Sequence, residues 1–162
     1  MLDVLLIVLA QVLGGPQADT ATATAAVPSQ AEPPRAQQAE PQVATGRFTT
    51  ALEVRPILTA TRGNWVALRD YDGQDLLYLT HLLAWRCGLL ALRVGVNGAA
   101  PQDWPLPPCH ADSAAPNALL PEDGLPYLAF PAGTVDSVDV QITYDDLTTD
   151  TAAFARAAIM MP

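Results

Sequence analysis

The chain has 162 residues, half of them hydrophobic (50%), and its 8 basic and 17 acidic side chains give a net charge of −9. This length corresponds to about one domain, and the acidity excludes nucleic acid as a partner, because phosphates require a basic surface. All basic residues are arginines, so functions that need a lysine, such as a Schiff base or a phosphate-binding P-loop, are also excluded.

The first segment of the chain is typical of an export signal. Residues 2–13 form an apolar run that Gly14 ends, and the run is shorter than the roughly 20 residues of a membrane span. Small residues follow and allow cleavage after Ala18. We therefore predict a signal peptide over residues 1–18, with a buried N-terminal core segment as the alternative. We expect no transmembrane span in the mature chain.

Residues 19–45 differ in composition from the rest of the chain. They are rich in Ala, Pro, Gln and Thr and contain no aromatic residue. Such a segment buries too little apolar surface to offset the entropy of ordering it, and its prolines favour extended conformations. We predict a disordered linker over residues 19–45 and a folded domain over residues 46–162. A proline-rich recognition ligand is the alternative for the linker.

The start of the folded domain predicts a β-hairpin. Residues 48–61 are rich in β-branched and apolar side chains, which favours one or two short strands broken at Pro56. A turn follows at residues 61–64, and residues 65–71 are expected to pair with the preceding strand.

Residues 72–88 are ambiguous between a helix and a strand, above all over residues 75–87. The segment is leucine-rich, an aspartate can cap its start, and Gly88 lies where a glycine often ends a helix. Alternation of apolar side chains allows a strand instead. We favour the helix, which gives an α+β fold: a β-rich single domain with one leucine-rich helix and a long proline-rich loop. The strand would give an all-β, immunoglobulin-like sandwich.

The second half of the domain predicts further strands around that loop. Residues 89–96 alternate as a strand does, and Asn97-Gly98 predicts the turn that ends it. Prolines recur over residues 101–131 and exclude any long regular element there. Residues 135–144 predict a strand, residues 145–148 a turn, and residues 151–160 a last strand or extended segment.

Cys87 and Cys109 are the only two cysteines. In the oxidising compartment that an export signal implies, such a pair is expected to form a disulfide, which would fix the proline-rich loop to the leucine-rich segment. With His81 and His110 the pair could supply four zinc ligands, but the spacing matches no common zinc motif. We predict the disulfide and no metal or cofactor.

His81 and His110 are the remaining candidates for chemistry. They could act with nearby aspartates as acid–base groups of a hydrolase, although no catalytic motif accompanies them. The spacing of Asp146, Thr148 and Asp150 is similar to that of a calcium loop but lacks its glycine and distant glutamate. A solvated hairpin turn explains this spacing, and cation binding is the weaker hypothesis.

Several short motifs together resemble an uncharacterised family of small exported proteins of alphaproteobacteria. The motifs are Trp65-Val66-Ala67, Tyr71-Asp72-Gly73-Gln74-Asp75-Leu76, Thr80-His81-Leu82-Leu83, Arg86-Cys87-Gly88-Leu89, Val96-Asn97-Gly98, Pro108-Cys109, Pro116-Asn117-Ala118 and Tyr144-Asp145-Asp146. The resemblance covers residues 48–162 and implies an exported bacterial protein, with no known activity or ligand. It also implies a glycine at position 147, where this chain has Leu147.

These features together predict a periplasmic or secreted, non-enzymatic module that acts by contact with a protein partner in the cell envelope. The alternative is a cell-envelope hydrolase that uses His81 and His110 with aspartates as acid–base groups.

Overall fold

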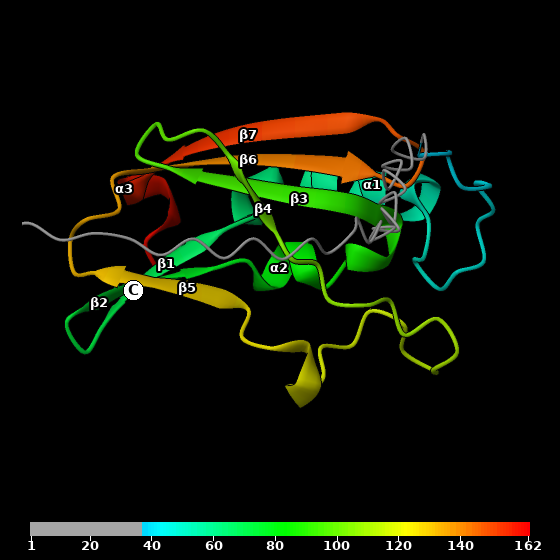
Figure 1. Cartoon of the computed structure of the whole chain (residues 1–162), viewed down its shortest axis with the longest axis horizontal. Helices are drawn as coiled ribbons and strands as arrows, with labels where there is room; N and C mark the ends of the chain where they lie inside the picture. The colour runs from blue at the N-terminus through cyan, green and yellow to red at the C-terminus, as the bar shows by residue number, and fades with distance from the viewer. Residues whose placement is uncertain (1–36) are drawn as a thin grey trace, which may run out of the picture. The chain divides into compact units, whose positions relative to one another are not determined.

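Two antiparallel β-sheets carry most of the regular structure, as seen in a computed structural model that describes residues 37–162 (Figure 1). The strands are β1 Ala67–Tyr71, β2 Gln74–Tyr78, β3 Leu89–Val96, β4 Gln102–Trp104, β5 Tyr127–Pro131, β6 Ser137–Tyr144 and β7 Thr149–Ala155. One sheet has the order β1-β2-β5 and the other the order β4-β3-β6-β7. The predicted signal peptide and residues 19–36 of the predicted linker lie outside the described residues.

Three α-helices and three short 3₁₀ helices precede, connect or follow the strands. They are α1 Ala51–Ala60, α2 Thr80–Leu83, α3 Arg156–Ile159, η1 Arg62–Asn64, η2 Arg86–Gly88 and η3 Pro121–Asp123 within the described chain. This composition confirms the predicted β-rich α+β fold.

One hydrophobic core joins the two sheets and α1. In β6, buried and half-buried residues alternate along the strand, with Val138, Val140 and Ile142 on the buried side. Leu68 of β1 and Leu77 of β2 enter the same core from the other sheet. The alternation follows from the period of two in a strand with one face buried.

The strands predicted over residues 48–61 are wrong, because this segment forms α1. Its buried side chains are Ala51, Val54 and Leu58, whose spacing of three and four places them on one face of a helix. Glu53 stabilises the start of the helix, because its carboxylate accepts a hydrogen bond from the backbone N–H of Thr49 at 3.0 Å. Pro56 is tolerated on the exposed side of the helix.

The hairpin predicted between residues 48–61 and residues 65–71 is therefore also wrong. β1 pairs with β2 through the turn Asp72-Gly73, in which φ is 51° at Asp72 and 73° at Gly73. Asp-Gly is a preferred sequence for a turn with two positive φ angles, and the close pairing of short strands follows from it. The aspartate that we expected to cap a helix is a turn residue.

The leucine-rich helix predicted over residues 72–88 is mostly wrong. Its first part is β2, and only Thr80–Leu83 is α-helical, as α2. Gly88 ends η2 and packs closely on α1, since a Cβ atom there would lie 2.5 Å from a side-chain carbon of Val54. The glycine is required by packing and does not terminate a long helix.

The later elements follow the sequence patterns closely. β3, the Asn97-Gly98 turn and β6 lie where they are predicted, and the proline-rich region holds only β4, η3 and β5. The predicted last strand is β7, which α3 then interrupts at Arg156.

Contacts with the domain begin before the predicted boundary at Gly46. The backbone N–H of Glu40 donates to the carbonyl of Asp145 at 2.9 Å. The Gln42 side chain donates to the Asp145 carboxylate and accepts from the backbone of Leu52, both at 2.8 Å. The last residues of the predicted linker therefore belong to the folded unit.

Candidate functional site

The predicted cysteine pair is present. Cys87 and Cys109 lie at disulfide distance, with their Cα atoms 4.9 Å apart. The bond joins η2 to the proline-rich loop and confirms the predicted attachment of that loop. His81 lies elsewhere, hydrogen-bonded to Thr61, so the four residues once considered as zinc ligands do not form one site. No group of His, Cys, Asp and Glu within residues 37–162 could hold a metal ion.

Arg86 is a second attachment point for the same loop. Its side chain is fully buried, although it precedes Cys87 in a short 3₁₀ helix. Its guanidinium donates hydrogen bonds to the carbonyls of Leu83, Pro108, Asn117 and Ala118 and to the carboxylate of Asp123. A buried guanidinium needs this many acceptors to offset its lost hydration. Arg86 therefore holds Pro108 and residues 117–123 of the proline-rich loop together.

His110 belongs to this buried network as well. Its Nε2 donates to the Asp123 carboxylate at 3.0 Å, and Asp123 also accepts from the backbone N–H of Leu120 at 2.9 Å. These two contacts hold the pKa of Asp123 below its ordinary value, and Leu120 contributes most. With Arg86 the carboxylate thus has three donors. The arrangement accounts for His110 and Asp123 as parts of the loop's internal support.

The tautomer of His81 is the opposite of the one that a general base for Thr61 would need. Thr61 Oγ1 donates its single hydrogen to the carbonyl of Ile57 at 2.7 Å, so it must accept in its 2.8 Å contact with His81 Nε2. Nε2 of His81 therefore carries the proton, and a base that activates a hydroxyl would do the reverse. Burial lowers the pKa of His81, so the ring is neutral at pH 7 and its Nδ1 is an acceptor.

A cleft of about 660 Å³ lies beside His81. We call it the Tyr78 cleft. It is lined by Asn64, Trp65, Ala67, Arg69, Tyr78, Thr80, His81, Ala84 and Met161. Its walls come from β1, the end of β2, α2 and the C-terminal residues, and the backbone N–H of Met161 donates to Leu68 of β1 at 2.8 Å.

A second cleft, of about 340 Å³, lies between the edge strands β4 and β5 of the two sheets. We call it the Leu125 cleft. Its lining is mostly apolar and consists of Leu83, Asp103, Trp104, Pro105, Pro107, Asp123, Gly124, Leu125, Tyr127 and Leu128. Leu125 is 68% exposed and Leu128 is 41% exposed. The loop that Arg86 and the disulfide hold in place therefore presents apolar side chains to solvent.

The outer edge of β5 borders this cleft and has free backbone groups. The backbone N–H of Leu79 donates to the carbonyl of Pro126, and that of Ala132 donates to the carbonyl of Gly73. Because hydrogen-bonded and non-hydrogen-bonded residue pairs alternate along antiparallel strands, these two bonds fix which residues of β5 bond to β2. In that alternation the N–H and C=O groups of Tyr127 and Ala129 point away from β2. They have no backbone partner among the described residues.

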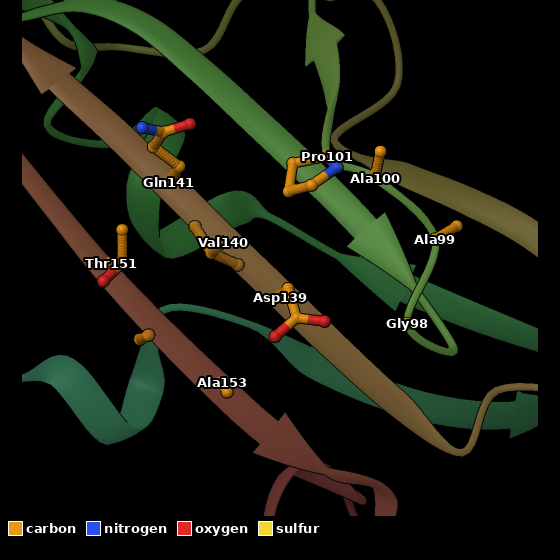
Figure 2. A pocket seen from close by; sticks show the side chains of 10 residues that line it. Gly98, Ala99, Ala100, Pro101, Asp139, Val140, Gln141, Thr151 and Ala153 are labelled. Carbon is orange, nitrogen blue, oxygen red and sulfur yellow. The ribbon is translucent and has the colours of Figure 1, made fainter.

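A third hollow lies on the outer face of the four-stranded sheet. Figure 2 shows Asp139 and Gln141 of β6, Thr151 and Ala153 of β7 and the turn at residues 98–101 around it. Most of these side chains are small. It combines neither the apolar walls nor the convergent polar groups that are typical of binding pockets.

Sequence reasoning found the cysteine pair and both histidines but not Arg86, Asp123 or the edge of β5. The partners of Arg86 are mainly backbone carbonyls, which leave no pattern in the sequence. The one signal in the sequence that could indicate a buried arginine is its place beside a cysteine in an apolar segment.

No helix in residues 37–162 is long and apolar enough to cross a membrane. Comparisons with protein-family models, with curated proteins and with solved structures found no match to this chain.

Proposed function

We propose that this protein is a non-enzymatic interaction module of the periplasm or the extracellular space, and that it binds an extended segment of a partner protein along β5. The observation that carries the proposal is the Leu125 cleft beside an open strand edge. The resemblance to exported alphaproteobacterial proteins agrees with this location.

The exposed leucines of the cleft belong to a loop that is held in place. Leu125 and Leu128 are 68% and 41% exposed, while Arg86 and the Cys87–Cys109 pair tie the loop to the core. Apolar side chains in a fixed position lose little entropy on binding, which favours their use in recognition.

The strand edge supplies the other half of the recognition. An extended segment laid beside β5 would exchange hydrogen bonds with the free N–H and C=O groups of Tyr127 and Ala129. Its alternate side chains would point into the Leu125 cleft, as in other cases where a peptide adds a strand to a sheet. The net charge of −9 favours a neutral or basic segment over an acidic one.

The cysteine pair supports action outside the cytoplasm. Disulfides persist in oxidising compartments and are rare in the reducing cytosol. The pair lies at disulfide distance, and residues 1–18 carry the predicted export signal.

Photo-crosslinking in the envelope fraction of the native host tests the proposal. A benzoylphenylalanine at position 125 should form a defined crosslink to one partner, and Ala129→Pro should abolish it. Proline removes an outward N–H and adds bulk at the edge, but it leaves the bonds of β5 to β2 intact. Thermal unfolding of Ala129→Pro checks that the fold is kept.

Leu52→Asp is the matched control, because Leu52 is also exposed, at 52%, but lies on α1 outside the cleft. It should leave the crosslink unchanged. A crosslink that survives Ala129→Pro in a folded protein, or the lack of any crosslink at position 125, would overturn the proposal.

A further inference from the structure

We propose that the Tyr78 cleft is a separate binding site for a small apolar carboxylate that also carries a hydrogen-bond donor. The volume of the cleft, about 660 Å³, is within the range of small-molecule sites, roughly 300–1,000 Å³. Tyr78 and Met161 supply aromatic and apolar walls, and Arg69, His81 and Thr80 supply polar groups beside them. Trp65 also borders the cleft, but its side chain is fully buried.

The charge of the cleft differs from that of the protein. The chain carries 17 acidic residues and a net charge of −9, yet none of the residues that line the cleft is acidic. Arg69 is the charged group among them. An anion in this cleft would meet a cation with no carboxylate competing at the same place.

Arg69 is available to bind a carboxylate. Five arginines of the described chain pair with aspartates: Arg55, Arg62, Arg86, Arg93 and Arg156. Arg69 forms no such pair within residues 37–162, and its guanidinium lies over the ring of Tyr71, 5.0 Å from the centroid. The parallel N–H groups of a guanidinium fit a carboxylate.

His81 is the reason why the ligand should also carry a hydrogen-bond donor. Its Nε2 hydrogen is used by Thr61, which leaves Nδ1 as an acceptor. Nδ1 has no hydrogen-bond partner among the described residues, and it is not one of their fully buried, unpaired polar atoms. A hydroxyl or amide N–H on the ligand would satisfy it.

Three probes separate these requirements. N-acetyl-L-phenylalanine has the ring, the carboxylate and an amide N–H. N-acetyl-L-phenylalaninamide lacks the carboxylate, and 3-phenylpropanoate lacks the amide N–H. Titration calorimetry with the full chain, with the indole NMR signal of Trp65 as a local reporter, measures each affinity.

We expect N-acetyl-L-phenylalanine to bind with a dissociation constant on the order of 1 mM, as suits a ligand of this size. The amide should bind about tenfold more weakly, because a charge-assisted contact is lost. The propanoate should bind about threefold to tenfold more weakly, because His81 Nδ1 is left unpaired.

Arg69→Gln should remove the preference for the acid over the amide. Arg93→Gln is the matched control, since it removes the same charge from an exposed arginine outside the cleft, and it should keep that preference. Leu125→Asp should not affect binding, which separates this site from the proposed peptide site.

Equal affinity for acid and amide in the wild-type protein would overturn the proposal. So would an acid preference that persists in Arg69→Gln, or the absence of a saturable change in the indole signal of Trp65. None of these results bears on the crosslinking at the Leu125 cleft.

Discussion

Leu147 holds a backbone conformation that a leucine adopts at a cost. Its φ is 70°, in the left-handed region. It lies between β6 and β7, where its N–H donates to the carbonyl of Tyr144 at 3.0 Å. The N–H of Tyr144 donates to the carbonyl of Thr148 at 2.8 Å and closes a loop in which Leu147 is the last residue. A residue with positive φ at this place is the normal end of a three-residue hairpin loop, and glycine usually fills it.

The cost can be isolated by comparing three substitutions at this position. Leu147→Ala, Leu147→Asn and Leu147→Gly all lose the part of the leucine side chain that is buried, since Leu147 is 40% exposed. Alanine keeps the left-handed cost of about 1 kcal/mol. Asparagine tolerates this conformation, and glycine avoids the cost but gains about 0.4–1 kcal/mol of entropy in the unfolded chain.

We therefore expect Leu147→Asn to be about 1 kcal/mol more stable than Leu147→Ala, with Leu147→Gly between the two. Urea unfolding at equal m-values measures these differences, and the midpoint of thermal unfolding should differ by about 4 °C. Equal stability of the alanine and asparagine variants would refute the argument that strain at Leu147 destabilises the loop.

Two further predictions concern the Asp75–Arg156 ion pair and the Cys87–Cys109 pair. Hydrogen bonds from Arg156, and then from the backbone of Val135, hold the pKa of Asp75 far below its ordinary value. The ionised carboxylate therefore stabilises the fold above about pH 4, and this contribution is lost as the pH falls further. Asp75→Asn should lower the free energy of unfolding by about 3 kcal/mol at pH 7, and its stability should fall less than that of the wild-type protein as the pH decreases. Urea unfolding at several pH values between neutral and acidic measures both effects. Parallel stability curves for the two proteins would contradict this. Replacing both Cys87 and Cys109 by Ala should cost about 3 kcal/mol, because the bond spans 22 residues, and unchanged unfolding in urea would argue against that role.

The elements that could be predicted are those whose local pattern has one explanation. β6 alternates Val138, Val140 and Ile142 with polar residues, and only a half-buried strand has that period. α1 was missed because its β-branched residues suggested strands, while its spacing of buried side chains and Glu53 favoured a helix.

The leucine-rich segment could not be resolved from local patterns. Leu76, Leu77 and Leu79 are all buried, since both faces of this region are covered. A segment buried on both faces has no apolar period, so helix and strand give the same signal. The Asp72-Gly73 turn was the evidence that favoured a strand.

Of the candidate sites, the cysteine pair could be predicted from the sequence and the two clefts could not. Cys87 and Cys109 could be paired because the chain has no other cysteine. The two clefts arise where strands and loops meet in space, and the lining residues of each come from three separate stretches of the sequence. Neither the composition of the sequence nor the spacing of its residues shows which segments come together in the fold.

The attachment of Glu40 and Gln42 to Asp145 has a mechanical consequence. Within residues 37–162, a pull applied from the N-terminal side is taken up at these hydrogen bonds, next to the start of α1, where Asp145 also accepts from the backbone of Ala51 at 2.9 Å. None of these residues lines the Tyr78 cleft or the Leu125 cleft. Tension along the chain would therefore load these hydrogen bonds before it deforms either cleft.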